Sequence, residues 1–575
     1  MALKTITEPR LDRPMVAALF DLARTSPDVP ALYLPQEDHL PHKTWRQLAD
    51  DTLRLTAYMN RLGVQTADRV VLWSDNRYEW IVVDFAIQCL GAIHVPLHGS
   101  LPASGSAAQI AHSEPTLVLI ATAAMAEALR GQAAAGPPNQ VRQVIDATNG
   151  EQSLLDRISA ISPGDGMAIM EQQATRFDPQ AIATILYSSG TSGEPKAVAL
   201  THANLTSNAY AAVDAVGEVA SDRRLNFLPF SHIYARTCDL YTWVARGSEL
   251  ALARNRESIF ADCRLVKPTL MNGVPYFYER IAQRVAESEN TAAPITIQQI
   301  LGGNIRACFC GGAPLPVGTF DFFHARGVPL LPGYGLTESS PVISFSTVTE
   351  FRRGTVGKAL PGIEVRFAED GELLTKGPHV MLEYWKEPEL TRETIRDGWL
   401  YTGDLGSIDA DGFISITGRK KDMIALSTGK KATPTHIEGL LCRMPFILQA
   451  LVVGNDQKYL AALIVPNAEA LGAWMEAQQL KVSSKPETLT HPRVLQLYQD
   501  RINQALESVA PYEQVKRFLL LDRGFTIEDG LLTPKLSMRR DAIHKRFQSD
   551  IAALFSGGGV AVEYNGSSAA GATDY

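Results

Sequence analysis

The distribution of apolar residues predicts alternating strands and helices from about residue 45 to residue 350. Residues 68–76 (DRVVLWSDN) form an apolar run that is typical of a buried strand. Residues 77–91 (RYEWIVVDFAIQCLG) read as the helix that follows, and residues 92–99 (AIHVPLHG) as the next strand. This order is typical of the βαβ unit of a parallel sheet, so we expect a large α/β domain of layered sheets.

The pattern changes at about Arg366, where short alternating runs are separated by Asp-Gly and Gly-Asp turns. Such turns between short strands are typical of a small β subdomain. After Gly418 the chain resumes as a smaller α+β unit, and it ends in a small, polar, glycine-rich segment that we expect to be disordered. The predicted parts are an N-terminal domain at 1–418, which includes the β subdomain at 366–417, a C-terminal domain at 419–555 and a tail at 556–575.

Two local patterns describe the smaller unit. Pro434 lies near the start of a predicted helix, and Thr435 and Glu438 have the spacing of a capping box. Residues 450–467 (ALVVGNDQKYLAALIVPN) are typical of a β-hairpin. We therefore expect a helix followed by a hairpin here.

Composition and charge narrow the class of protein. The chain has 575 residues, of which 45% are hydrophobic and 20% are charged, as in ordinary globular proteins. The net charge of −8 argues against binding along a nucleic-acid backbone, so we expect no nucleic-acid partner. The N-terminus has no apolar signal core, and no run approaches the roughly 18 apolar residues that span a bilayer. We expect a cytoplasmic location, with peripheral membrane contact left open.

The cysteines favour a reducing compartment rather than a metal site or a disulfide framework. Six cysteines are spread through the chain, and the closest pair is Cys308 and Cys310. Positions two apart in a strand share a face, so we expect two buried thiols here instead of metal ligands.

A hydroxyl- and glycine-rich loop lies within residues 185–205 (ILYSSGTSGEPKAVALTHANL). It follows an apolar strand and precedes a helix for which Thr201 is a candidate cap, so we expect a strand-to-helix loop. Hydroxyl donors, free backbone amides and one cation are the groups that bind a polyphosphate; the alternative is a flexible turn. The loop is not a Walker motif, because Gly193 is followed by Glu-Pro-Lys. The candidate phosphate-binding residues are Ser188, Ser189, Gly190, Thr191, Ser192, Gly193 and Lys196.

Five further segments follow this loop in a fixed order, and together the six resemble the signature motifs of the acyl-adenylate-forming superfamily. This superfamily contains acyl-CoA synthetases, luciferases and the adenylation domains of peptide synthetases. Residues 227–241 (FLPFSHIYARTCDLY) and 268–281 (PTLMNGVPYFYERI) are similar to the long-chain fatty acyl-CoA synthetase branch. The six segments are SSGTSGEPK (188–196), CGGAPLP (310–316), GYGLTESSP (333–341), YTGDLG (401–406), GRKKDMI (418–424) and LLTPKLSMRRDAI (531–543).

The resemblance implies a binding site for ATP and Mg²⁺. Thr191 and Lys196 would close over the β- and γ-phosphates, and Glu338, together with Thr191, would hold Mg²⁺ through hard oxygen atoms. Asp404 would accept hydrogen bonds from the ribose hydroxyls, with Arg419 donating nearby. Read singly, these residues would be ordinary turn or surface residues. The remaining nucleotide-binding candidates, which the resemblance places around the adenine and the phosphates, are Gly312, Ala313, Pro314, Tyr334, Gly335 and Thr337.

The resemblance also implies an acyl pocket and a moving domain. His232 and Val274 match positions that line the acyl pocket, although a lone histidine is more often structural. Lys421 matches the hinge about which a mobile C-terminal domain swings between the two half-reactions. The reaction implied is fatty acid, ATP and coenzyme A giving acyl-CoA, AMP and pyrophosphate through an acyl-adenylate, for medium to long chains.

The C-terminal motif departs from the family pattern. The family's catalytic lysine falls at Ser537 in this chain, while a lysine is present at Lys535. In an extended segment, residues two apart point the same way about 6.6 Å apart, a gap comparable to the reach of a lysine stem. We hypothesise that Lys535 substitutes. The alternatives are weak adenylation, or a solvated Lys535 in an acyl- or nucleotide-binding pseudoenzyme. An enzyme that passes the acyl group to an acyl carrier protein also stays open.

Overall fold

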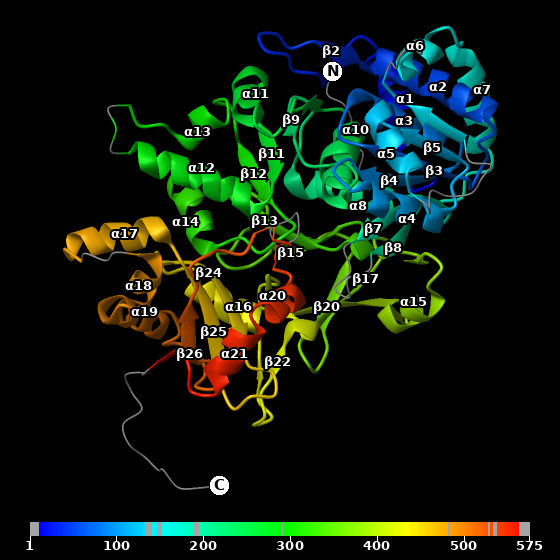
Figure 1. Ribbon diagram of the computed structural model, residues 1–575. Helices are drawn as coiled ribbons and strands as arrows, with labels where there is room; N and C mark the ends of the chain where they lie inside the picture. The colour runs from blue at the N-terminus through cyan, green and yellow to red at the C-terminus, as the bar shows by residue number, and fades with distance from the viewer. Residues whose placement is uncertain are drawn as a thin grey trace. The chain divides into compact units, whose positions relative to one another are not determined.

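The chain folds into two compact units in the computed structural model (Figure 1), which describes residues 11–132, 141–146, 152–188, 195–289, 291, 293–480, 484–526, 529–532 and 538–562. The larger unit comprises Met1–Arg366, Leu374–Thr402 and Ile408–Ile414. The smaller unit comprises Phe367–Leu373, Gly403–Ser407 and Ser415–Tyr575. A large N-terminal domain of sheets and helices and a C-terminal domain confirm the predicted α/β fold class.

A seven-stranded sheet in the larger unit contains the predicted βαβ unit. Strand β3 pairs in parallel with β4, with Val71 opposite Val95, and helix α3 connects them. Helix α3 (Tyr78–Cys89) is buried almost throughout, because it is apolar on all faces. The sheet order is β18 (Glu383–Tyr384), β8 (Lys196–Thr201), β7 (Ile182–Ser188), β4 (Ile93–His98), β3 (Arg69–Ser74), β5 (Leu117–Ile120) and β6 (Val141–Val144).

A nine-stranded sheet forms the second layer of this unit, and its centre is parallel. Strands β13, β12, β11 and β9 run in the same direction, so the loops after them meet at one edge of the sheet. Figure 1 shows β11, β12 and β13 side by side. The order is β15 (Lys358–Ala359), β14 (Val342–Phe345), β13 (Leu330–Gly335), β12 (Ala307–Cys310), β11 (Leu270–Gly273), β9 (Arg223–Asn226), β10 (Glu249–Leu252), β1 (Pro30–Tyr33) and β2 (His42–Thr44).

The expectation of a strand-to-helix loop at residues 189–195 is wrong. Residues 196–201 form strand β8, which pairs antiparallel with β7, so the loop joins the two strands of a hairpin. The apolar run after Lys196 is buried between β7 and β18, which favours a strand there. Helix α8 (His202–Val216) begins only after β8, and Thr201 caps it in a capping box with Asn204, which confirms the predicted cap.

A π-helical turn, η1 (Arg236–Tyr241), connects the two sheets through buried hydrogen bonds. Arg236 forms an ion pair with Asp84 on α3 and donates to Thr184 Oγ1 on β7 at 2.7 Å. Asp239 accepts from Asn226 on β9 at 2.8 Å and from Asn272 on β11 at 2.6 Å. These buried groups are satisfied by partners in both sheets, so the turn fixes the sheets relative to one another.

Helices cover the sheets of the larger unit, and within the described residues none is long and apolar enough to cross a membrane. Cys308 and Cys310 are both buried on β12 as free thiols, as predicted. The helical segments not yet given are α1 (Val16–Thr25), α2 (Trp45–Arg61), α4 (Ala103–Ser113), α5 (Ala123–Arg130), α6 (Leu154–Ser159), α7 (Pro163–Ala174), α9 (Ile233–Ala235), α10 (Thr242–Arg246), α11 (Ile259–Val266), α12 (Pro275–Ser288), α13 (Ile297–Ile300), α14 (Val317–Ala325), η2 (Thr337–Ser339) and α15 (Pro388–Thr394).

Short strands follow the two large sheets along the chain. One sheet has the order β16 (Glu364–Phe367), β17 (Glu372–Lys376), β20 (Trp399–Ile408) and β19 (Ile395–Arg396), with β21 (Ile414–Arg419) beside β20. Strands β22 (Ile424–Ala425) and β23 (Lys431–Ala432) form a pair.

The smaller unit is an α+β structure around a four-stranded sheet. Strands β24 and β25 pair antiparallel, which confirms the predicted hairpin. Its strands are β24 (Ile447–Val453), β25 (Leu460–Pro466), β26 (Val515–Leu520) and β27 (Val560–Ala561), and its helical segments are η3 (Lys420–Asp422), α16 (Pro434–Leu441), α17 (Ala468–Ala477), α18 (Lys485–Thr490), α19 (Pro492–Ala505), α20 (Arg540–Arg546) and α21 (Gln548–Phe555).

Two details of this unit differ from the expectations. The predicted capping box is wrong: α16 starts at Pro434 with Thr433 as its N-cap, and Glu438 accepts from Val452 N at 2.7 Å. Burial of Glu438 and its pairing with Arg540 explain why this side chain is unavailable to the cap. Regular structure also extends past residue 556, because β27 pairs with β26; residues 563–575 lie outside the described residues.

Candidate active site

The two ends of the glycine-rich loop face each other across the β7–β8 hairpin. Ser188 is the Cα partner of Lys196, and Ser188 Oγ donates to Lys196 O at 3.4 Å. The hairpin therefore places the lysine at the base of the loop, on a strand rather than within a flexible turn. The remaining candidates in the loop lie outside the described residues: Ser189, Gly190, Thr191, Ser192 and Gly193.

Lys196 and Glu338 converge on one tyrosine. Tyr384 Oη donates to Glu338 Oε1 at 2.8 Å, and Lys196 Nζ lies 5.1 Å from the centroid of the same ring. Tyr384 is on β18, which pairs with β8, while Glu338 lies in the 3₁₀ turn η2 after β13. The pairing of β18 with β8 thus brings together two residues that are 142 positions apart, since the chain numbers are 196 and 338. The carboxylate offers a hard oxygen donor of the kind that Mg²⁺ prefers.

Neighbouring strand ends place the adenine candidates beside the acyl-pocket candidate Val274. Gly312, Ala313 and Pro314 follow β12, Tyr334 lies at the end of β13, and Val274 follows β11. The three strands are adjacent and parallel, so these residues lie at one edge of the sheet. Gly312 has φ +80°, a conformation that favours glycine, and a Cβ built there would lie 3.9 Å from Val274 Cγ1.

Close backbone contact also explains Gly335, which lies just before Thr337 and Glu338. A Cβ at Gly335 would overlap Pro341 O at 1.8 Å, so only glycine fits. Thr337 is the first residue of η2, the turn that carries Glu338. This tight turn fixes the backbone of Glu338.

His232 has a structural role in addition to its position in the candidate pocket. It is the N-cap of α9, and its Nδ1 accepts from the backbone N–H of Tyr234 at 3.3 Å. The ring is half-buried and lies at the start of the helical turn that leads into η1. The capping bond is a structural role of the kind that the sequence analysis left open for a lone histidine.

In the smaller unit, the two candidate ribose ligands contact each other. Arg419 Nε lies 2.7 Å from Asp404 Oδ1, and Asp404 is buried. Glu372 supports this turn, because it accepts from Gly403 N at 2.9 Å and from Lys420 Nζ at 2.7 Å. Hydrogen bonds with Asp370 and then Glu372 raise the pKa of Lys420, which keeps this lysine charged.

The candidate hinge residue and the C-terminal motif lie in the same unit. Lys421 is in the turn η3, where burial lowers its pKa, and its Nζ is 3.8 Å from Asp422 Oδ1. Leu532 and Met538 pair as an antiparallel bridge, and Arg540 forms an ion pair with Glu438. Lys535 and Ser537 lie outside the described residues.

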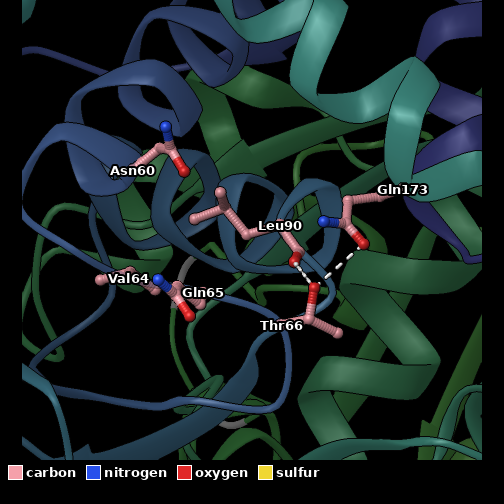
Figure 2. Close-up of a pocket in the computed structure, with 6 residues that line it drawn as sticks. All are labelled: Asn60, Val64, Gln65, Thr66, Leu90 and Gln173. Carbon is pink, nitrogen blue, oxygen red and sulfur yellow. Dashed lines mark hydrogen bonds between the residues drawn. The ribbon is translucent and has the colours of Figure 1, made fainter.

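A surface hollow of 320 Å³ lies apart from all these candidates (Figure 2). Thr66 Oγ1 donates to Leu90 O at 3.3 Å and to Gln173 Oε1 at 3.0 Å within it. None of its lining residues is an acid, a base or a nucleophile with a shifted pKa, so we assign it no chemistry. It is lined by Asn60, Val64, Gln65, Thr66, Leu90 and Gln173.

Sequence reasoning missed Tyr384, Glu372 and Lys420. Tyr384 meets Glu338 only because β18 pairs with β8, and nothing in the local sequence around residue 384 signals this pairing. Glu372 and Lys420 are 48 positions apart, so their contact also has no local signal.

Comparison with known proteins places the chain in a family. The AMP-binding enzyme model matches residues 19–385, and the AMP-binding enzyme C-terminal domain model matches residues 421–558. The chain belongs to this family. A curated relative, the long-chain-fatty-acid--CoA ligase FadD15 of Mycobacterium bovis, is 31% identical over 540 residues, which cover 86% of this chain and 89% of the relative.

Solved structures of AMP-binding enzymes share the fold. ATP-bound MatB from Rhodopseudomonas palustris superposes with a TM-score of 0.74 at 22% identity, covering 93% of this chain and 99% of that chain. The anthranilate CoA ligase AuaEII in complex with anthranoyl-AMP gives a TM-score of 0.75 at 20% identity, covering 94% and 98%. At these identities the likeness supports the fold alone and does not identify the acid substrate.

Proposed function

We propose that the protein is a long-chain fatty acid–CoA ligase. It activates the fatty acid with ATP and transfers the acyl group to coenzyme A, releasing AMP and pyrophosphate. The observation that carries the proposal is the convergence of Lys196 and Glu338 on Tyr384 at the base of the glycine-rich hairpin, in a chain of the AMP-binding enzyme family. The name of the relative from Mycobacterium bovis supports a fatty acid as the substrate.

Lys196 and the loop bind the terminal phosphates of ATP in this account. A carboxylate is a poor electrophile, so the acid is first joined to AMP: a carboxylate oxygen attacks the α-phosphorus and pyrophosphate leaves. The Lys196 ammonium neutralises the charge that develops on pyrophosphate. The base of the loop is fixed by the β7–β8 pairing at Ser188 and Lys196, and Thr191 and its neighbours complete the contact with the phosphates.

Glu338 fits the role of a Mg²⁺ ligand by its donor chemistry. Mg²⁺ is bound in nucleotide sites through one or two carboxylates, waters and phosphate oxygens, and it stabilises the charge of the phosphates. Tyr384 donates to Glu338 Oε1, and the carboxylate would hold Mg²⁺ through its other oxygen. Thr191 is the second proposed oxygen ligand.

The nucleoside is bound by backbone and by charged hydrogen bonds. The backbone of Gly312, Ala313 and Pro314 approaches the adenine closely, and Tyr334 stacks on the ring. Asp404 accepts from the ribose hydroxyls and Arg419 donates beside it. In the proposal Val274 and His232 line the acyl pocket, and the proximity of Val274 to Gly312 supports an acyl chain that lies next to the adenine-binding residues.

The second half-reaction transfers the acyl group. The sulfur of coenzyme A attacks the acyl carbon, AMP leaves and the thiol proton passes to solvent. The C-terminal domain moves about Lys421 between the two half-reactions, and Lys535 supplies the cation that the family places at Ser537. The proposed location is cytoplasmic, and peripheral membrane contact stays open.

A product assay tests this function. Purified protein is incubated with MgATP and fatty acids of graded length, with and without coenzyme A, and the products are identified by mass spectrometry. We expect AMP and acyl-CoA in equal amounts when coenzyme A is present. Acyl-AMP without acyl-CoA would redirect the proposal to a carrier-protein acceptor, and the absence of both AMP and acyl-AMP under both conditions would refute it in favour of a pseudoenzyme.

A further inference from the structure

Main-chain hydrogen bonds attach residues 381–385 both to β8 and to the backbone of Glu338. Leu382 N donates to Ala199 O at 3.1 Å and Trp385 N donates to Ala197 O at 2.7 Å, which attaches the segment to β8 next to Lys196. Met381 N donates to Glu338 O at 2.9 Å. The segment is therefore held at fixed distances from the backbones that carry the lysine and the carboxylate.

Tyr384 projects from this segment to both charged side chains. It is 4% exposed, its hydroxyl donates to Glu338 Oε1 at 2.8 Å, and its ring lies under Lys196 Nζ at 5.1 Å. Its backbone is held as well, since Tyr384 N donates to Thr391 Oγ1 at 2.9 Å. A buried tyrosine with a fixed backbone has little freedom to turn, so both contacts are imposed by the fold.

The buried tyrosines of the chain have two kinds of hydroxyl partner. Tyr278 and Tyr498 donate to main-chain carbonyl groups, at 2.9 Å and 2.8 Å. Tyr384 donates to a carboxylate, as the buried Tyr78 and Tyr241 also do. Among the residues that the structure describes, Lys196 and Glu338 form no ion pair with each other, although one contacts the ring of Tyr384 and the other its hydroxyl.

We propose that Tyr384 is a positioning residue that keeps the Glu338 carboxylate and the Lys196 ammonium apart and directs each to a different part of MgATP. The inference rests on the proposed function. The hydroxyl fixes the carboxylate through Oε1 and leaves the other oxygen for the cation, as outer hydrogen-bond partners of metal ligands do. The ring face holds the ammonium by a cation–π contact at the base of the loop, apart from the carboxylate.

Binding of Mn²⁺ as a probe for the divalent cation tests the hydroxyl without relying on turnover. Free Mn²⁺ is measured by electron paramagnetic resonance in the presence of ATP, and ATP binding without metal is measured by calorimetry. In Tyr384→Phe the ring remains, so we expect the Mn²⁺ dissociation constant to rise about 10-fold while metal-free ATP binding is unchanged. Tyr384→Leu also removes the ring face, so we expect it to weaken metal-free ATP binding too.

Two further variants separate positioning from loss of stability. Tyr498→Phe removes an equally buried hydroxyl hydrogen bond in the smaller unit, and we expect wild-type Mn²⁺ binding. If Tyr384 acts through Glu338, adding Tyr384→Phe to Glu338→Gln causes no further loss of Mn²⁺ affinity; additive losses would indicate a merely structural role and overturn the proposal.

The outcomes also separate this proposal from the proposed function. If the wild-type protein binds Mn²⁺ with ATP and Tyr384→Phe binds it equally well, the positioning role is wrong and the ligase function stands. If the wild-type protein binds no ATP with or without Mn²⁺, both proposals fail.

Discussion

Three buried histidines of the larger unit make its stability dependent on pH. Burial, and then the Arg236 guanidinium, lower the pKa of His94 to about 4. Burial likewise lowers the pKa of His202 to about 4, and burial alone lowers the pKa of His379 to about 4. All three are 5% exposed or less, so the folded chain holds them as neutral rings at pH 7.

The direction of the effect follows from proton binding. An unfolded histidine has a pKa of about 6.5, so between pH 6.5 and pH 4 the unfolded chain binds more protons than the folded chain. Stability is therefore fully present above pH 6.5 and falls as the pH decreases toward 4. Lowering the pH from 7 to 5 costs about 2 kcal/mol for each histidine with these pKa values. Asp239 acts in the opposite direction, because burial raises its pKa to about 6.

Comparison of variants isolates the contribution of one histidine to the pH dependence of stability. Urea unfolding is followed by tryptophan fluorescence at pH 7 and pH 5; six of the seven tryptophans lie in the larger unit. We expect His379→Gln to lose about 2 kcal/mol less than the wild type over this interval, because one protonation is removed. His39→Gln, at an exposed position, serves as the control with wild-type behaviour. Equal pH dependence of His379→Gln and the wild type would refute the reasoning.

Three further predictions concern the candidate site and the N-cap of helix α8. We expect Asp404→Asn to raise the KM for ATP about 10- to 100-fold in a coupled AMP assay, because the substitution weakens the two proposed charged hydrogen bonds to the ribose. Asp409→Asn serves as the control with an unchanged KM. Equal KM values for Asp404→Asn and the wild type would contradict the proposed role of Asp404. Lys535→Ala lowers the rate of acyl-AMP formation in single-turnover experiments while Lys545→Ala does not; an unchanged rate ends the substitution hypothesis. Thr201→Ala removes the cap of α8 and lowers the free energy of unfolding by about 1 kcal/mol, measured in urea; no change would show that the cap is replaced by solvent.

Patterns within one element were the part of the fold that the sequence predicted well. The strands and helix of residues 68–98 have continuous apolar runs, and the cap at Thr201 depends on residues within one turn. The mistake at residues 196–201 has a physical reason as well. A short apolar run after a loop is compatible with a strand or a helix start, and the pairing with β7 and β18 decides between them.

Contacts between distant segments limited the prediction of the site. Lys196, Glu338 and Asp404 became candidates from the sequence because each belongs to a short local motif. Tyr384 and Glu372 were missed, since their partners, Glu338 in η2 and Gly403 on β20, are distant in the sequence. The wrong prediction of a capping box has the same cause, because Glu438 pairs with Arg540 and accepts from Val452 on β24 rather than from its own helix start.

An isotope experiment tests the central claim, the acyl-adenylate route, most directly. A long-chain fatty acid labelled with ¹⁸O in both carboxylate oxygens is converted with MgATP and coenzyme A, and the AMP is analysed by mass spectrometry. Attack of the carboxylate on the α-phosphorus followed by cleavage at the acyl carbon leaves one ¹⁸O in each AMP, which is the result the account predicts. Unlabelled AMP, or ADP in place of AMP, would contradict it.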